Sequence, residues 1–450
     1  MSDTEPATRA DASGPDREPP GPDGLPLVGS TLSFLDDPFE FYDTLDEYGD
    51  IVGYRVGPWR FCTLLHPEHV QQVLLDQPES FAKWDRQSLG VEFAPDGLLQ
   101  TDGEQWRRQR ELLQPAFRPN RIAEYADAMG RYAAETVADW EEGQRVNLSE
   151  TTSKLTLRIL ADSLFDIDLR TERDVVTEFA TALNARANAD SLAAFLPEWI
   201  PTPANRRYRS ARADLREFIE RTIDERDREG GDDLLGLMLD AETEDGQRLD
   251  EVEIRDQLVT FLFAGHETSA LALTYAVLCL AQHPEEADRL RAEYDEVLDA
   301  DRPTLADLGA LDATERVIQE TLRLYPPAYV IFRETTDPVE VGGYRLPEGR
   351  KLTLPQFRLH RDDRFWDDPQ RFDPDRFARD VDRPEYAYFP FGGGPRHCIG
   401  MRFARMELKT VLATLLERAE FDLLSDPNPE RTAGATMQPV DDVVVRVRKR

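Results

Sequence analysis

The sequence predicts a mostly α-helical protein of the α-rich α+β class, in which a large helical body carries small β-sheets near both ends of the chain. From about residue 103 to residue 324, helix-length segments with helical periodicity follow one another, separated by Pro or Gly. Short β-rich runs come before and after this region. Of the 450 residues, 40% are hydrophobic, which is enough for a sizeable core.

The N-terminal segment differs from the rest in composition. Residues 1–23 are rich in Pro, Asp, Glu, Gly and Ser and poor in large apolar side chains, so we expect a disordered acidic tail there and a single domain over 24–450. The tail lacks the basic start and apolar run of a signal peptide. With three widely spaced cysteines and no disulfide framework, a reducing, cytoplasmic location is expected.

The elements follow from local patterns. Residues 51–56 and 60–65 predict a β-hairpin, and Cys62 within it fits a buried small hydrophobe. Periodicity predicts a long helix over 250–283. Its apolar part, 259–281, contains His266 and Glu267, which favours a buried helix over a membrane span. The remaining expected elements are strands at 330–333, 339–341 and 351–354 and a helix over about 399–419.

Acidic residues outnumber basic ones by 88 to 54, giving a formal net charge of −34. This charge argues against nucleic-acid binding. The acidic residues are spread along the whole chain, which is typical of proteins adapted to a salty cytoplasm; an ordinary acidic cytosolic protein is the alternative.

One cysteine stands in an unusual context, the stretch FGGGPRHCIG that ends at Gly400. A lone cysteine such as Cys398 is most often a buried hydrophobe. Here the glycines let the backbone approach a flat partner closely. The helix that follows and Arg396 would both favour a thiolate. The stretch therefore predicts an anionic sulfur beside a large planar group.

This stretch resembles the haem-binding loop of the cytochromes P450, with matches at Phe391, Gly394, Arg396, Cys398 and Gly400. The resemblance implies the cytochrome P450 fold, with haem b between the long helix and the cysteine loop. It also implies that Cys398 is the thiolate ligand of the iron. Phe391 would pack near the sulfur, and Arg396 would pair with a haem propionate.

The pentapeptide AGHET in the long helix resembles the oxygen-binding groove of the same family. Ala264 would accept a hydrogen bond from the Thr268 hydroxyl, and Gly265 would let the helix approach the haem. Thr268 would hold the activated oxygen and Glu267 would pass protons. His266 has no ligand role. The alternative is a polar patch on a buried helix.

Two further sets match the family in order and spacing. Glu320 and Arg323, with Arg376, would form a buried charged triad; a surface ion pair is the alternative. Trp106, Arg110 and Arg333 would contact the propionates. For Arg110 a solvated helix face is the alternative, and for Arg333 a charge on a strand surface.

The resemblance implies a haem-thiolate monooxygenase that inserts one atom of O₂ into an apolar substrate, by hydroxylation or epoxidation. Residues 262, 263, 328 and 330 would lie near the substrate, a fatty acid or terpenoid. Residues 191–201 lie where relatives have a mobile lid and could touch a membrane peripherally. We expect no transmembrane segment, and we expect the protein to be a monomer.

Electrons would come from a separate partner, a ferredoxin with its reductase. Arg107 and Arg108 offer a basic patch for it, and a solvated helix face is the alternative. Two alternatives stay open. One is a peroxide-driven hydroxylase, which often lacks the threonine. The other is a non-catalytic haem-thiolate sensor or electron carrier, which would need no Glu267.

Overall fold

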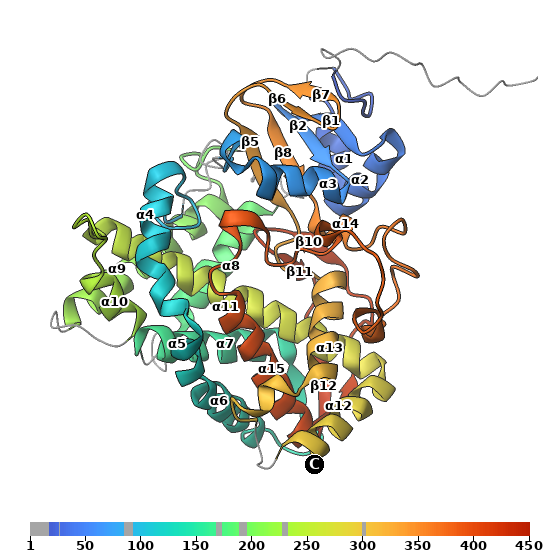
Figure 1. The fold of residues 1–450 in the computed structure, drawn as a ribbon. Coiled ribbons are helices and arrows are strands. Elements are labelled where there is room, and N and C mark those ends of the chain that lie inside the picture. Colours follow the sequence, from blue (N-terminus) through green and yellow to red (C-terminus); the bar gives the residue numbers. More distant parts are fainter. Residues whose placement is uncertain are drawn as a thin grey trace, which may run out of the picture.

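The computed structural model describes residues 18–26, 28–84, 93–167, 173–188, 196–226, 233–298 and 303–450. In Figure 1 a sheet-rich lobe lies at the top and a larger helical body lies below it. The α-helices of the described chain are α1 (Thr31–Asp36), α2 (Pro38–Thr44), α3 (Pro67–Gln71), α4 (Gly103–Leu113), α5 (Pro119–Glu124), α6 (Ala126–Ala138), α7 (Leu148–Phe165), α8 (Arg173–Ala187), α9 (Pro203–Glu225), α10 (Leu234–Asp240), α11 (Glu251–Gln282), α12 (Pro284–Val297), α13 (Asp312–Leu324), α14 (Gln356–Leu359) and α15 (Met401–Arg418).

The strands form small sheets rather than one large layer. They are β1 (Ile51–Val56), β2 (Trp59–Leu64), β3 (Phe81–Ala82), β4 (Arg145–Asn147), β5 (Ile331–Thr335), β6 (Val339–Val341), β7 (Tyr344–Leu346), β8 (Lys351–Leu354), β9 (Ala419–Leu423), β10 (Arg431–Ala433), β11 (Met437–Pro439) and β12 (Val444–Lys449). In the described chain the largest sheet has the order β1-β2-β8-β5-β3. Its β2–β8 pair is parallel, with Phe61 opposite Lys351, so strands far apart in sequence meet in the upper lobe.

The long helix α11 crosses the middle of the helical body (Figure 1). It begins with a capping box between Asp250 and Glu253 and ends before Pro284, which opens α12. It packs against α7, α9, α13 and α15. Among the described helices α11 alone is long and apolar enough to cross a membrane, and 83% of its most apolar window is buried inside the protein. The sequence prediction of a buried core helix over 250–283 is thus confirmed.

The α-rich α+β class and the small sheets are confirmed. The strand bounds 51–56, 339–341 and 351–354 agree residue for residue with β1, β6 and β8. Cys62 is buried, as expected of a small hydrophobe, and Cys279 is buried as well.

The predicted tail over 1–23 differs from the structure at its end. Residues 1–17 lie outside the described part of the chain, whereas residues 18–21 contact the sheet. Gly53 N donates to Pro20 O at 2.8 Å, and the Glu18 carboxylate lies 2.8 Å from the Arg350 guanidinium. Composition alone predicts a disordered segment here. It cannot show that the backbone of this segment bonds to β1, or that its charged side chain pairs with the residue just before β8.

Candidate haem site

The cysteine loop turns tightly in front of α15. The φ angles of Gly392 and Gly394 are +71° and +61°, a region that other L-residues rarely adopt. A Cβ on Gly394 would lie 1.7 Å from the backbone oxygen of Leu74, so the close approach to that segment also requires glycine. Cys398 N donates to Phe391 O at 2.9 Å, which closes the loop and presents the sulfur before the helix begins.

Two groups favour a thiolate at Cys398. The Gly400 N–H and the charge of Arg110 lower the pKa of the thiol, while desolvation raises it and has the larger effect. On balance the pKa of the Cys398 thiol is raised, and the Gly400 N–H and the Arg110 charge are the two groups that would stabilise a thiolate. The sequence assigned this electrostatic role to Arg396, but in the structure Arg110 acts on the sulfur. Arg396 is instead occupied by the Asp102 carboxylate.

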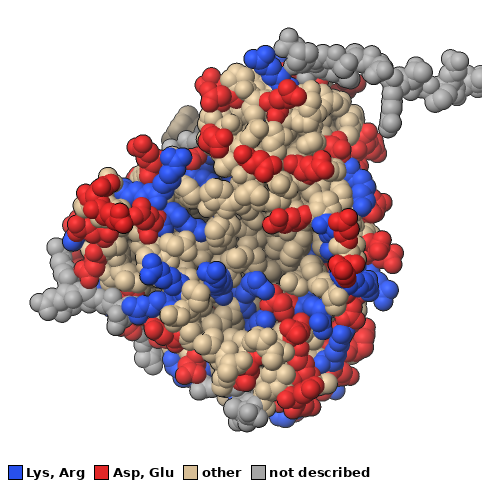
Figure 2. Space-filling view, in the orientation of Figure 1, with Lys and Arg blue, Asp and Glu red and all other residues tan. Residues whose placement is uncertain are grey.

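The middle of α11 is open on one side. From Asp256 to Leu280 every side chain is buried except those of Ala264, Gly265 and Thr268. Figure 2 shows that this face of the molecule is hollowed at its centre. The openings at Ala264 and Thr268 lie one turn apart, so they share one face of the helix. A flat group bound through Cys398 needs such an uncovered stretch on the helix that faces it.

Two predicted details of the AGHET segment have different outcomes. Thr268 Oγ1 donates to Ala264 O at 2.8 Å, as predicted from the sequence. Gly265 was expected to serve the approach to the haem. A Cβ there would lie 2.8 Å from Leu160 Cδ1 of α7, so glycine also lets α11 pack closely on α7, and its role toward the haem stays a prediction.

The predicted propionate-binding cations converge near the loop. Arg396 stacks over Trp106, with its Cζ 4.4 Å from the ring centroid, and donates to Thr101 O at 2.9 Å. Arg110 donates to His397 O at 3.1 Å. In the described part of the chain Arg333 has no carboxylate within salt-bridge distance; it donates instead to the carbonyl of Phe332, at 2.8 Å.

Arg333 provides the test of whether these residues fit a haem. Burial and the neighbouring charge of Arg396 lower the pKa of its guanidinium to about 10. The lowered pKa indicates that too little negative charge lies near this cation to balance it. A buried arginine that lacks a carboxylate partner and stands beside a second arginine calls for an anion. The two carboxylates of a haem would supply it. The residues present therefore fit the group: Cys398 would be the iron ligand, and Arg333, Arg396, Arg110 and Trp106 would surround the propionates.

Glu267 is buried beside Thr268 in sequence but points to another face of α11. Burial raises the pKa of its carboxyl to about 7, against the opposing effect of three hydrogen-bond donors. Oε1 accepts from Asn184 Nδ2 at 2.5 Å, Thr436 Oγ1 at 2.7 Å and Gln438 Nε2 at 2.5 Å. A carboxyl with this pKa can gain and lose a proton at neutral pH.

His266, to which the sequence assigns no ligand role, hydrogen-bonds within its own helix. Its side chain is fully buried, and burial lowers the pKa to about 4, so it stays neutral. Nδ1 bonds to the carbonyl of Leu262, which accepts, so the proton lies on Nδ1.

The structure brings the charged triad together in the core. Arg323 donates to both Glu320 oxygens, at 2.7 and 2.9 Å, and Arg376 Nε donates to Oε1 at 3.0 Å. Glu320 and Arg323 are wholly buried and Arg376 is 3% exposed, which excludes the surface ion pair. The arginines also donate to backbone carbonyls of 360, 367, 369 and 371. The triad therefore ties α13 to the segment before the cysteine loop rather than to the loop itself.

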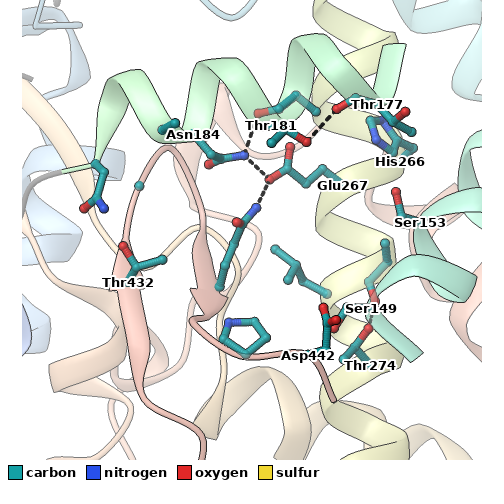
Figure 3. A pocket seen from close by; sticks show the side chains of 18 of the residues that line it. Ser149, Ser153, Thr177, Thr181, Asn184, His266, Glu267, Thr274, Thr432 and Asp442 are labelled. Carbon is teal, nitrogen blue, oxygen red and sulfur yellow. Dashed lines mark hydrogen bonds between the residues drawn. The ribbon is translucent and has the colours of Figure 1, made fainter. Parts of the chain in front are cut away.

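Sequence reasoning missed the partners of Glu267. Asn184 comes from α8 (Figure 3), and Thr436 and Gln438 come from the β10–β11 hairpin. No local pattern marks an Asn, a Thr or a Gln as a partner of a residue 83 to 171 positions away. Their role appears only once the chain is folded.

Comparison with known proteins agrees with this geometry. The family model described as Cytochrome P450 matches residues 19–444. Cyclooctat-9-en-7-ol 5-monooxygenase of Streptomyces melanosporofaciens is 36% identical, covering 93% of both chains. Pentalenene oxygenase of Streptomyces avermitilis is 36% identical, covering 92% of this chain and 94% of that protein. The solved structure of retinoic acid bound cyanobacterial CYP120A1 matches with a TM-score of 0.86 and 28% identity, covering 96% of this chain and 99% of that chain.

The fold and the site define a haem-thiolate oxygenase. The chain belongs to the cytochrome P450 family. It is a monooxygenase that binds haem iron, uses O₂ and takes its electrons from a redox partner, and its substrate is an apolar organic molecule.

Proposed function

We propose that this monooxygenase hydroxylates or epoxidises a cyclic terpenoid. The relatives named above support the terpenoid class: two are named for cyclic terpenoid substrates, and the solved structure holds an apolar isoprenoid acid. The apolar residues near the site fit such a substrate. Phe263 of α11 meets Phe93 edge-on at 5.4 Å and Phe179 of α8 at 6.3 Å, while Ala328 and Val330 retain exposure.

The observation that carries the proposal is the joint presence of three features: Cys398 on its loop, the opening at Thr268, and Arg333, which has no carboxylate within salt-bridge distance among the described residues. The cofactor we assign is haem b, which supplies the iron at which O₂ is activated. Cys398 Sγ is its ligand, and Phe391, whose carbonyl closes the loop, packs beside the sulfur. Trp106, Arg110, Arg333 and Arg396 hold the propionates by charge and stacking.

We assign the proton chemistry to two side chains of α11. The Thr268 hydroxyl can turn from Ala264 O to hydrogen-bond with the oxygen that is being reduced. The Glu267 carboxyl holds and releases a proton one residue away. Ala264 leaves the space beside Thr268 open, so a substrate can lie within reach.

We assign the electron donor to a ferredoxin that works with its reductase. Figure 2 shows Lys and Arg side chains gathered around the central hollow, in the region of α4, α5 and the start of α15. Arg107, Arg118 and Arg402 are exposed on these elements and suit an acidic partner. The assignment of Arg108 to this surface from the sequence is wrong. Arg108 pairs with the buried Glu253 and donates to Arg248 O at 2.8 Å.

The compartment we assign is the cytoplasm of an organism that accumulates salt, on the basis of the charge of −34. The predicted lid over 191–201 lies partly outside the described residues. Trp199 within its described part is 76% exposed. This side chain supports a contact with an apolar substrate on entry or with a membrane surface.

The experiment supplies holoenzyme, ferredoxin, its reductase and ¹⁸O₂ with a panel of cyclic terpenes and with fatty acids of equal carbon number. We expect one ¹⁸O atom in a terpenoid product and weaker binding of the fatty acids, followed by haem absorbance. A product formed with peroxide alone, and not with the electron donor, would show a peroxide-driven hydroxylase. No product with any substrate would favour the sensor.

A further inference from the structure

His360 lies between the buried charged triad and the cysteine loop. It directly follows α14, and its side chain is fully buried. Its backbone contacts the triad, because Arg323 Nη1 donates to His360 O at 2.8 Å. Its ring contacts the chain that enters the loop, because Nε2 accepts from Phe389 N at 2.9 Å. Phe389 precedes the loop residue Phe391 by two positions, so one residue contacts both the triad and the entrance to the loop.

The backbone of Phe389 is held at both of its polar atoms. His360 accepts from the N–H, and Gln356 Nε2 donates to the carbonyl oxygen. Gln356 and His360 stand four residues apart, so one turn of helix presents both side chains to the same residue. Both are fully buried, and Phe389 is buried as well. Two buried hydrogen bonds therefore fix the place and the orientation of the chain where it enters the loop.

Backbone bonds carry this position on to the cysteine. Gly392 N donates to Phe389 O at 2.9 Å, which closes the turn at the start of the loop. Cys398 N donates to Phe391 O at 2.9 Å, which brings the end of the loop back to its start. The sulfur thus stands on a loop whose first turn is built on the carbonyl of Phe389. A shift of Phe389 would carry both bonds with it.

The ring of His360 is fixed in orientation and in charge. It meets the Phe389 ring edge-on, with centroids 5.3 Å apart and planes at 88°, and its centroid lies 5.2 Å from that of Tyr388. Because Nε2 accepts, the proton of the neutral ring lies on Nδ1. Burial, followed by the charge of Arg323, lowers the pKa of the imidazole to about 3. At neutral pH the ring is therefore uncharged and Nε2 remains an acceptor.

We propose that His360 is a positioning residue for the iron ligand: its ring couples the buried charged triad to the cysteine loop and so keeps Cys398 Sγ where the iron binds. The inference rests on the proposed function, because it takes Cys398 as that ligand. His360 acts through Phe389 and the loop rather than on the haem. Without Nε2 the N–H of Phe389 would be buried and unpaired, and the entrance to the loop would leave α14 to reach water.

The first test separates the ring from its acceptor. His360→Phe keeps an aromatic ring of similar size but removes the acceptor, whereas His360→Gln returns an acceptor close to the place of Nε2. Ferrous holoprotein with CO reports thiolate ligation by its absorbance. The ratio of haem with the thiolate bond to haem without it is measured in urea below the unfolding transition. We expect His360→Phe to lower this ratio about 5- to 150-fold and His360→Gln to recover most of it. An unchanged ratio in His360→Phe, or no recovery in His360→Gln, would overturn the proposal.

The matched control is His283→Phe at the end of α11. His283 Nδ1 also bonds to a carbonyl, that of Cys279 at 2.8 Å, and its ring centroid lies 5.0 Å from that of Phe372. The exchange of residue types is the same, but the contacts of this histidine do not include the entrance to the loop. We expect the ratio of the wild type in this variant. An equal loss in both variants would show that the ratio follows overall stability, and it would overturn the proposal.

Amide hydrogen exchange tests the contact without reference to the iron. The N–H groups of Gly392 and Cys398 are bonded within the loop, and the amides in the middle of α15 serve as the reference. We expect His360→Phe to speed exchange at the two loop amides about 5- to 150-fold and to leave the reference amides at their wild-type rates. Gln356→Met, which removes the donor to Phe389 O, should act in the same direction even if His360→Phe folds poorly. Equal rises in the loop and in α15 would show a general loss of stability and would overturn the proposal.

The two measurements separate the inference from the function on which it rests. A wild-type CO complex without thiolate ligation would refute Cys398 as the iron ligand, and with it the proposed function. The exchange rates decide separately whether His360 holds the loop. Neither measurement requires a substrate or turnover.

Discussion

At the scale of single residues, the position of Gly394 depends on the absence of a side chain. Its φ is +61° and a Cβ would meet the Leu74 carbonyl oxygen at 1.7 Å. We expect Gly394→Ala to destabilise the protein by about 2–5 kcal/mol, because a strained φ adds to a clash with backbone that cannot move alone. Urea unfolding measures this loss.

The matched control is Gly343→Ala. Gly343 has a φ of +81°, and a Cβ added there would have no atom within 4 Å, so only the strain of the backbone remains. We expect a loss of about 1–2 kcal/mol there. Equal losses in the two variants would show that the contact with Leu74 contributes nothing.

At the scale of elements, the buried charged triad links α13 to the segment that precedes the cysteine loop. Glu320→Ala leaves Arg323 and Arg376 buried without a counter-charge, and we expect a loss of about 3–5 kcal/mol with poor retention of haem. Glu220→Ala on α9 is the control. It breaks an i,i+4 pair with Arg216 whose side chains are 58% and 52% exposed, so we expect less than about 1 kcal/mol. Normal stability and haem content in Glu320→Ala would contradict the assigned role.

The same scale shows what the sequence could predict. α11 was predicted to within a residue at each end because its capping box and Pro284 are local signals. Strand pairing was not predicted: β2 and β8 pair across almost the whole chain, and no local signal carries that register. The candidate site likewise has a part that the sequence predicts and a part that it does not. Cys398 and Thr268 lie in contiguous motifs, whereas the donors to Glu267 depend on where α8 and the hairpin meet.

At the scale of the whole molecule, charge dominates. The formal net charge is −34, and Asp and Glu side chains recur along the outer rim in Figure 2, between tan and blue residues. Many of the arginines already have acidic partners, as in the pairs Arg207–Glu178 and Arg364–Asp50. The surplus carboxylates therefore repel one another in the folded state more than in the expanded chain.

Salt must relieve this repulsion. The Debye length falls from about 10 Å at 0.1 M to about 3 Å at 1 M, so charges on neighbouring elements cease to interact over that range. We expect the melting temperature to rise steadily with KCl up to molar concentration and the fold to loosen in dilute buffer. Choline chloride at equal ionic strength should act equally if screening is the cause, whereas an effect of KCl alone would indicate bound potassium. A melting temperature that is independent of both salts would remove the physical basis for placing this enzyme in a salty cytoplasm, since the acidic surplus would then cost the fold nothing.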